Sequence, residues 1–188
     1  LLPWHLFQLS LQKSSISLVG NANLITKVYF PRVIIPLSSV LAVLVDYAIS
    51  MALLFIAMAI FRLPITLKAL CLIPLTLLAV LAALAVGLWL SALNVQYRDV
   101  QQIVPFLVQI WMYASPIVYP ISTIPEGTLR SLYSLNPMVG VVQGFRWALF
   151  GGTPPDFTLA ISSAAVVLLL VSGLFFFRRM EKTFADVV

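Results

Sequence analysis

The chain has very few charged residues, and this scarcity limits what kind of protein it can be. Only 9% of its 188 residues are charged and 62% are hydrophobic, whereas about a quarter of the residues in a soluble domain are charged. Water could not keep such a chain in solution, and its length leaves no room for a soluble domain beside several membrane spans. Any chemistry that needs a large aqueous site must therefore come from a partner.

Residue types that build catalytic and metal sites are also scarce. The one cysteine, Cys71, excludes an internal disulfide and a cysteine metal cluster. The one histidine, His5, is better explained as a polar residue on a helix face than as a general base. The chain has no P-loop pattern, no paired carboxylates at helical spacing and no cluster of metal ligands. We predict no catalytic residue, no metal site and no cofactor bound by this chain.

What the chain has instead is long apolar runs. Cys71–Leu93 and Phe157–Phe177 contain no charged residue, and Val33–Phe61 contains only the acid Asp46 near its middle. Roughly 20 helical residues, at about 1.5 Å each, cross the ~30 Å hydrocarbon core of a bilayer. These runs predict an all-α integral membrane protein, a polytopic helical bundle.

Two further spans are weaker. Leu1–Val19 is marginal, because four polar residues share one helix face that we expect toward protein or water: His5, Gln8, Gln12 and Ser15. Ile103–Tyr119 contains Pro105 and Pro116, which predict a kink or unwinding near its far end. About five spans are therefore predicted.

Residues 122–150 are too long for a hairpin turn and still apolar. Their stretch Met138–Phe150 would measure only about 20 Å as a helix, which is short of a span. We therefore predict a pair of short re-entrant helices before the last span, with a break at Leu135-Asn136-Pro137.

The lysine and arginine residues predict the orientation. Six of them lie with residues 21–32, residues 94–102 and the C-terminal tail, and four lie on the opposite side. The six are Lys27, Arg32, Arg98, Arg178, Arg179 and Lys182, and the four are Arg62, Lys68, Arg130 and Arg146. This excess favours a cytoplasmic C-terminus. Loops that face an anionic membrane explain the net charge of +5, and no nucleic-acid partner is predicted.

Three features have a functional and a structural explanation. Asp46 is either a coupling or substrate-binding acid or a structural one, protonated, hydrogen-bonded or displaced toward an interface. Arg98-Asp99 and the basic segment before Pro31 either dock a soluble partner or form solvated turns. Aromatic residues near the far end form either an interfacial belt or the wall of a sugar path. These residues are Trp111, Tyr113, Tyr119, Phe145, Trp147 and Phe150.

Six stretches, in this order, carry a resemblance to a known family. They are LLPWHLF, NANLITKVYFPRVIIPLSSV, NVQYRDV, WMYASPIVYPIS, LYSLNPMVGVVQGFRWALFG and FFFRRMEKTFADVV. The chain resembles the transmembrane permease subunit of type 2 ABC exporters. Within that family it resembles the branch that exports polysaccharides and polyol phosphates, such as O-antigen, capsule and teichoic acid.

The resemblance implies a six-span, multi-pass subunit of the bacterial cytoplasmic (inner) membrane. Two copies would surround a channel for a lipid-linked glycan, with membrane lipid around them. Each copy would contact one of two ABC ATPase subunits, which would bind ATP and magnesium. Proteins of this family begin with a cytoplasmic amphipathic helix and a first span, and neither is found in this sequence. We therefore expect residues 1–188 to be one permease domain that is N-terminally truncated.

The resemblance also implies functional residues. Residues 21–32 match the cytoplasmic gate or coupling helix, residues 94–102 a second cytoplasmic contact, and residues 122–150 the outer re-entrant helices. The implied ATPase-coupling residues are Asn21, Lys27, Tyr29, Arg32, Gln96, Tyr97, Arg98 and Asp99. The implied channel residues are Trp111, Tyr113, Tyr119, Asn136, Arg146 and Trp147. Asp46 matches no role in the family.

Three other functions are alternatives. The nearest is a type 2 ABC permease for a drug or another lipid. A secondary carrier would be expected to contain inverted repeats, and none is evident. A membrane-embedded glycosyl- or acyltransferase would be expected to cluster acidic or histidine residues near one membrane face, and these residues are scattered.

Overall fold

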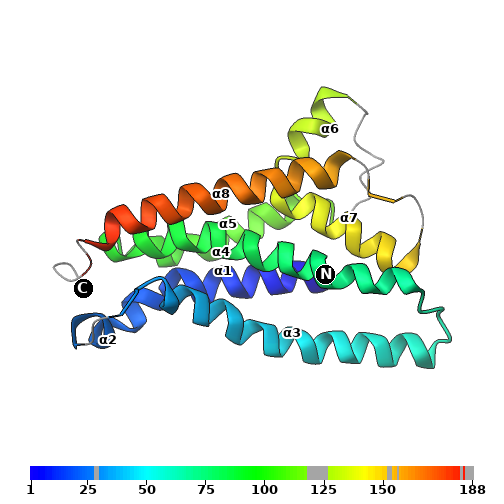
Figure 1. The fold of residues 1–188 in the computed structure, drawn as a ribbon, viewed down its shortest axis with the longest axis horizontal. Helices are drawn as coiled ribbons and strands as arrows, with labels where there is room; N and C mark the ends of the chain where they lie inside the picture. Colours follow the sequence, from blue (N-terminus) through cyan, green and yellow to red (C-terminus); the bar gives the residue numbers. More distant parts are fainter. Residues whose placement is uncertain (28–29, 118–126, 152–153, 156, 183, 185–188) are drawn as a thin grey trace.

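The protein forms a bundle of helices (Figure 1). A computed structural model describes residues 1–27, 30–117, 127–151, 154–155, 157–182 and 184. Three helices are long and apolar enough to cross a membrane. They are α3 (Ile34–Ile60), α4 (Leu72–Gln96), which continues the 3-10 helix η1 (Leu67–Cys71), and α8 (Phe157–Glu181). The described residues contain no strand. The prediction of an all-helical membrane protein is confirmed.

Five further helices complete the described fold. They are α1 (Leu2–Gly20), α2 (Ala22–Lys27), α5 (Val100–Tyr113), α6 (Thr128–Tyr133) and α7 (Pro137–Phe150). The two short helices predicted before the last span are present as α6 and α7, and the chain breaks between them at 134–136.

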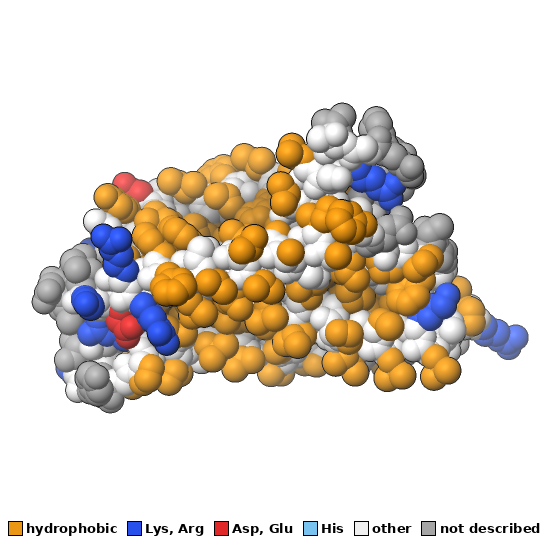
Figure 2. Space-filling model, turned by 45° about the horizontal axis from the view of Figure 1, so that its top comes forward, with side chains coloured by type: hydrophobic (Ala, Val, Ile, Leu, Met, Phe, Trp, Pro, Cys, Tyr) orange, Lys and Arg blue, Asp and Glu red, His pale blue; other side chains and the backbone are white. Residues whose placement is uncertain are grey.

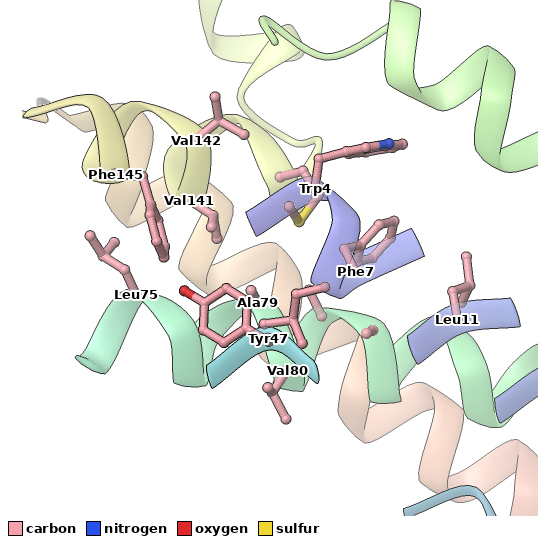
Figure 3. Close-up of a cluster of buried hydrophobic side chains, with 14 of the residues drawn as sticks. Trp4, Phe7, Leu11, Tyr47, Leu75, Ala79, Val80, Val141, Val142 and Phe145 are labelled. Carbon is pink, nitrogen blue, oxygen red and sulfur yellow. The ribbon is translucent and has the colours of Figure 1, made fainter. Parts of the chain in front are cut away.

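Helix α1 lies in the middle of the bundle, beside α3 and α4 (Figure 1). Its side chains Trp4, Phe7 and Leu11 are at most 2% exposed. Figure 3 shows them gathered with residues of α4 and α7, such as Ala79 and Val141. The polar face predicted for this helix is divided, because His5 is exposed whereas Ser15 is buried. The sequence predicted only a marginal span here because of the polar residues, whereas the apolar side chains of α1 lie in the centre of the core.

Small residues let α1 and α4 approach closely. Ala79, Ala83 and Gly87 follow one another at four-residue spacing on α4, and all three are buried. A Cβ atom on Gly87 would lie 2.5 Å from the Ser14 hydroxyl oxygen and 2.9 Å from its Cβ atom, so any larger residue there would force Ser14 of α1 to shift. Lipid chains are as apolar as leucine, so close packing of this kind replaces the hydrophobic effect between membrane helices.

Helix α8 packs against the other side of α4. The Trp89 ring of α4 stacks on the Phe176 ring of α8, with ring centroids 4.2 Å apart. The indole nitrogen of Trp89 also donates to the Ser172 hydroxyl at 3.4 Å. Near these residues the two backbones come close enough that Gly173 has no room for a side chain.

Two boundaries differ from the sequence prediction. Most of residues 94–102 is helical and not a loop, because α4 continues to Gln96 and α5 begins at Val100. The Asn94 side chain joins the end of α4 to α5, because its oxygen accepts from the Gln101 amide at 3.2 Å. Its nitrogen donates to the Ser15 carbonyl at 3.1 Å and so connects the same place to α1. The expected unwinding near Pro116 appears as an early end of α5 at Tyr113.

Candidate functional site

Three segments far apart in the sequence meet at one end of the bundle, which we call the tail end. They are α2, the turn 97–99 and the last residues of α8 (Figure 1). A buried apolar cluster connects them, made of Leu18, Ile25, Ile35, Leu88, Ala92, Val95, Phe177 and Phe184. The segments predicted to couple to an ATPase are therefore packed together and are not independent loops.

The turn after α4 is open to solvent. Gln96, Tyr97, Arg98 and Asp99 are all exposed, and Tyr97 is 59% exposed. Exposed aromatic and arginine side chains next to each other are common in protein-binding surfaces. Lys27, at the end of α2, is exposed as well, and Tyr29 lies outside the described residues. The tail end thus offers side chains that a partner can contact.

Two of the predicted coupling residues are engaged within the chain. The Asn21 side-chain nitrogen donates to the Ser17 carbonyl at 2.8 Å and so connects α1 to α2. The Arg32 amide donates to the Glu181 carboxylate at 3.2 Å, and the Arg32 guanidinium donates to the Glu181 carbonyl oxygen. Glu181 was missed in the sequence, because it stands 149 residues from its partner and nothing local marks it.

At the other end, Asn136 connects α5 to α7. Its side-chain oxygen accepts from the Trp111 indole nitrogen at 3.0 Å and from the Met138 amide at 3.1 Å, which caps α7. Its side-chain nitrogen donates to the Ser115 hydroxyl at 2.9 Å and to the Ala114 carbonyl at 3.2 Å. Two predicted channel residues, Trp111 and Asn136, are therefore in direct contact, and the Asn136 amide serves the protein itself.

The other predicted channel residues do not form one wall with this pair. Arg146 of α7 donates to the Ile117 carbonyl at 2.7 Å and so holds the chain beyond α5. Tyr113 is 62% exposed at the end of α5. Trp147 lies under the Lys68 ammonium, 5.5 Å from its ring centroid, and lines a cavity of about 320 Å³ between α4, α7 and α8. Tyr119 lies outside the described residues.

An ion pair on α1 and α3 gives Asp46 a partner that the sequence did not reveal. The Lys13 nitrogen lies 3.7 Å from an Asp46 carboxylate oxygen, and these side chains are 49% and 63% exposed. Asp46 is near the middle of the spanning helix α3. A charge in contact with lipid at that depth costs a few kcal/mol. We therefore expect this face of α1 and α3 to meet water or protein and not hydrocarbon.

The ion pair predicts unequal effects of single and double substitutions. Asp46→Leu leaves the Lys13 ammonium without a partner, whereas Lys13→Leu with Asp46→Leu removes both charges. We expect a coupling of about 1 kcal/mol, so that the single variant yields roughly fivefold less folded protein than the double variant. Size-exclusion chromatography of the extracted protein measures this. Equal yields would mean that the two charges do not depend on each other.

Metal ligands do not come together in the part of the chain that the structure describes. No group of three or more histidine, cysteine, aspartate or glutamate side chains could hold an ion there. The absence of a metal site from the whole chain stays a prediction. What the described arrangement offers is a packed helical bundle with an exposed surface at its tail end.

Known proteins share this sequence over most of its length. The model of the family described as "ABC-2 type transporter" matches residues 1–150. The O-antigen export system permease protein RfbA of Myxococcus xanthus is 33% identical over 186 residues, which are 97% of this chain and 71% of that protein. Two proteins of Klebsiella pneumoniae with the same name are 27% and 25% identical, over 100% of this chain and 73% of each relative. The chain therefore belongs to the ABC-2 type transporter family.

Proposed function

We propose that this chain is the membrane-spanning subunit of an ATP-driven exporter that moves a polysaccharide of the O-antigen class across the cytoplasmic membrane. The observation that carries the proposal is the match to O-antigen export permeases over 97–100% of the chain. The apolar, helical fold agrees with a transport subunit. ATP hydrolysis, with its magnesium, belongs in this proposal to a separate ABC ATPase, two copies of which serve two permease subunits.

The proposed topology has five spans, α1, α3, α4, α5 and α8, of the six expected for the family. Figure 2 supports it, because a broad hydrophobic band separates the lysine and arginine side chains at the two ends. As a helix of 14 residues, α5 covers only about 21 Å and needs the chain beyond it to complete a crossing. In this topology α6 and α7 enter the outer half of the membrane and return, and the C-terminus is cytoplasmic.

The tail end is the proposed contact with the ATPase. Residues 96–99 and Lys27 are exposed there, and Ile25 and Val95 belong to the same buried cluster. Movement of α2 would therefore be transmitted to the end of α4 through this cluster. A partner that binds ATP can shift a transporter between two arrangements only if its contacts differ between them. The cluster provides the path by which such a contact acts on α1, α4 and α8.

A second copy is the proposed partner of α5. This helix buries only Val104 and Val108, whereas Ile103, Phe106 and Ile110 are 58–70% exposed. A C2 dimer uses the same surface on both copies, so an exposed apolar face of this kind suits it. Between the copies we place the path of the lipid-linked glycan, with Trp111, Tyr113, Tyr119 and Trp147 as candidates for its wall. Asn136 and Arg146 hold the surrounding helices.

Charge reversal in the exposed turn tests the coupling surface. The double variant Arg98→Asp with Asp99→Arg keeps the net charge, and both side chains are exposed. We expect it to insert normally and to leave ATP hydrolysis by the complex in place, while export per ATP hydrolysed falls roughly tenfold, the effect of about 1.4 kcal/mol of lost coupling.

The matched control is Lys182→Glu, which changes another exposed charge at the same end. It should export normally. Normal export by the double variant as well would remove residues 96–99 from the proposed contact.

A further inference from the structure

A groove opens between α3 and α4 at the end of the bundle opposite the tail end. Its volume is about 670 Å³, within the range of about 300–1,000 Å³ that is usual for small-molecule sites. Its walls are apolar and come from three elements, with Met51 and Phe55 on α3, Leu67 and Leu70 on η1, and Ile73 on α4. We call it the α3–α4 groove.

The connection between the two helices creates this groove. The chain leaves α3 through Arg62, which has a φ of 53°, and η1 then precedes α4. This path sets the start of α4 away from the end of α3 (Figure 1). At one wall the Tyr47 and Thr76 hydroxyls are hydrogen-bonded to each other at 3.0 Å. The groove therefore presents few polar atoms that would retain water.

The size of the groove limits what can occupy it. A spanning helix about 10 Å wide and ~30 Å long fills roughly 2,400 Å³, several times the available volume. A slender, flexible and apolar occupant fits better. Both walls are spanning helices, and Leu70 and Ile73 are 64% and 70% exposed. The groove therefore opens to the bilayer, where acyl chains are the abundant molecules of this shape.

Two basic residues lie in the connection that borders the groove. They are Arg62 and Lys68, and both are exposed, with the Lys68 ammonium also lying over the Trp147 ring of α7, 5.5 Å from its centroid. From Tyr47 to Arg98 the sequence contains no acidic residue, so the connection and α4 carry no carboxylate that opposes the two cations, and the acid of α3, Asp46, is paired with Lys13. Basic side chains at a membrane surface attract anionic headgroups.

We propose that the α3–α4 groove binds one acyl chain of an anionic phospholipid, whose headgroup is held by Arg62 and Lys68. Such a lipid fills the space where α3 and α4 diverge and so supports their outer ends. The site concerns the surrounding bilayer and not the exported glycan. It therefore does not depend on the proposed function.

Native mass spectrometry of the full-length protein, extracted in mild detergent and given dioleoyl phosphatidylglycerol, tests the proposal. The unaltered protein should retain one lipid per subunit. Ile73→Trp and Leu70→Trp fill the groove and should lower retention about tenfold, because the buried chain supplies most of the affinity. Leu168→Trp, on the exposed face of α8, is the matched control and should retain the lipid.

The headgroup contact has its own test. Arg62→Gln with Lys68→Gln should lower the preference for phosphatidylglycerol over phosphatidylcholine roughly tenfold or more. Equal retention by the groove variants and the control would overturn the proposal, and so would an unchanged headgroup preference. A disulfide between the Ile73→Cys residues of two copies, in a Cys71→Ser background, would also overturn it, because the groove would then hold protein.

Discussion

Asn136→Ala is expected to separate α7 from the end of α5 and to destabilise the bundle by about 2–4 kcal/mol. Loss of the cap on Met138 costs about 1 kcal/mol. The Trp111 indole N–H, which donates to Asn136 at 3.0 Å, would lose its partner, and an unsatisfied donor of this kind costs about 1–3 kcal/mol. Thermal unfolding in detergent, followed by near-ultraviolet circular dichroism of the tryptophans, measures the loss.

Two variants make this prediction specific. Asn136→Asp keeps the oxygen that accepts from Trp111 and Met138 and loses the nitrogen that donates to Ser115 and Ala114. Its stability should therefore lie between those of the unaltered protein and the alanine variant. Gln109→Ala changes an exposed amide of α5 and should have little effect. If Asn136→Ala unfolded like Gln109→Ala, the hydrogen bonds of Asn136 would not hold α7.

Gly173→Val is expected to have an effect of similar size at the contact of α8 with α4. A Cβ atom at Gly173 would lie 2.7 Å from the Ala85 carbonyl oxygen and 3.1 Å from the Trp89 ring. The oxygen belongs to the backbone of a long helix, so it cannot turn aside as a side chain does. Overpacking of this kind costs about 1–3 kcal/mol, and the β-branch adds to it.

The matched control is Gly20→Val, since a Cβ atom at Gly20 meets nothing within 4 Å. Both variants carry the same substitution, so the difference between them isolates the helix contact. We expect Gly173→Val to lower the unfolding temperature well below that of Gly20→Val. Unfolding at the same temperature would show that α4 and α8 can move apart at this position without loss.

The arrangement at the two ends suggests how such a subunit works. At the tail end a buried cluster ties α2 to α4 and α8, and at the other end Asn136 and Arg146 tie α5 and the residues after it to α7. The long helices between are closely packed through small residues. A push on α2 would therefore move whole helices and not only the surface that receives it.

The sequence predicted the elements whose signal is local. The runs without charge became α4 and α8, and the break before α7 falls where Asn136 and Pro137 place it, because asparagine caps helices and proline suits their first turn. Residues 94–102 were predicted as a loop from their polarity. At the end of a span, however, polarity marks the membrane surface and not the end of the helix.

Pairs that depend on packing could not be predicted in this way. Lys13 and Asp46 come together because α1 and α3 lie side by side, and Arg32 meets Glu181 because the end of α8 lies beside the segment that precedes α3. Hydropathy and spacing describe one segment at a time. They mark Asp46 as unusual in its span, but they do not show which helix lies beside it.

Purification of the full-length protein from its native membrane in mild detergent, with identification of the proteins that accompany it, shows whether a partner ATPase drives this subunit. We predict an ABC ATPase in equal amount, and we expect the variant with Arg98 and Asp99 reversed to retain it, because that variant loses coupling and not the complex. Recovery of the intact protein without any ATPase, in repeated mild extractions, would contradict an exporter driven by a partner.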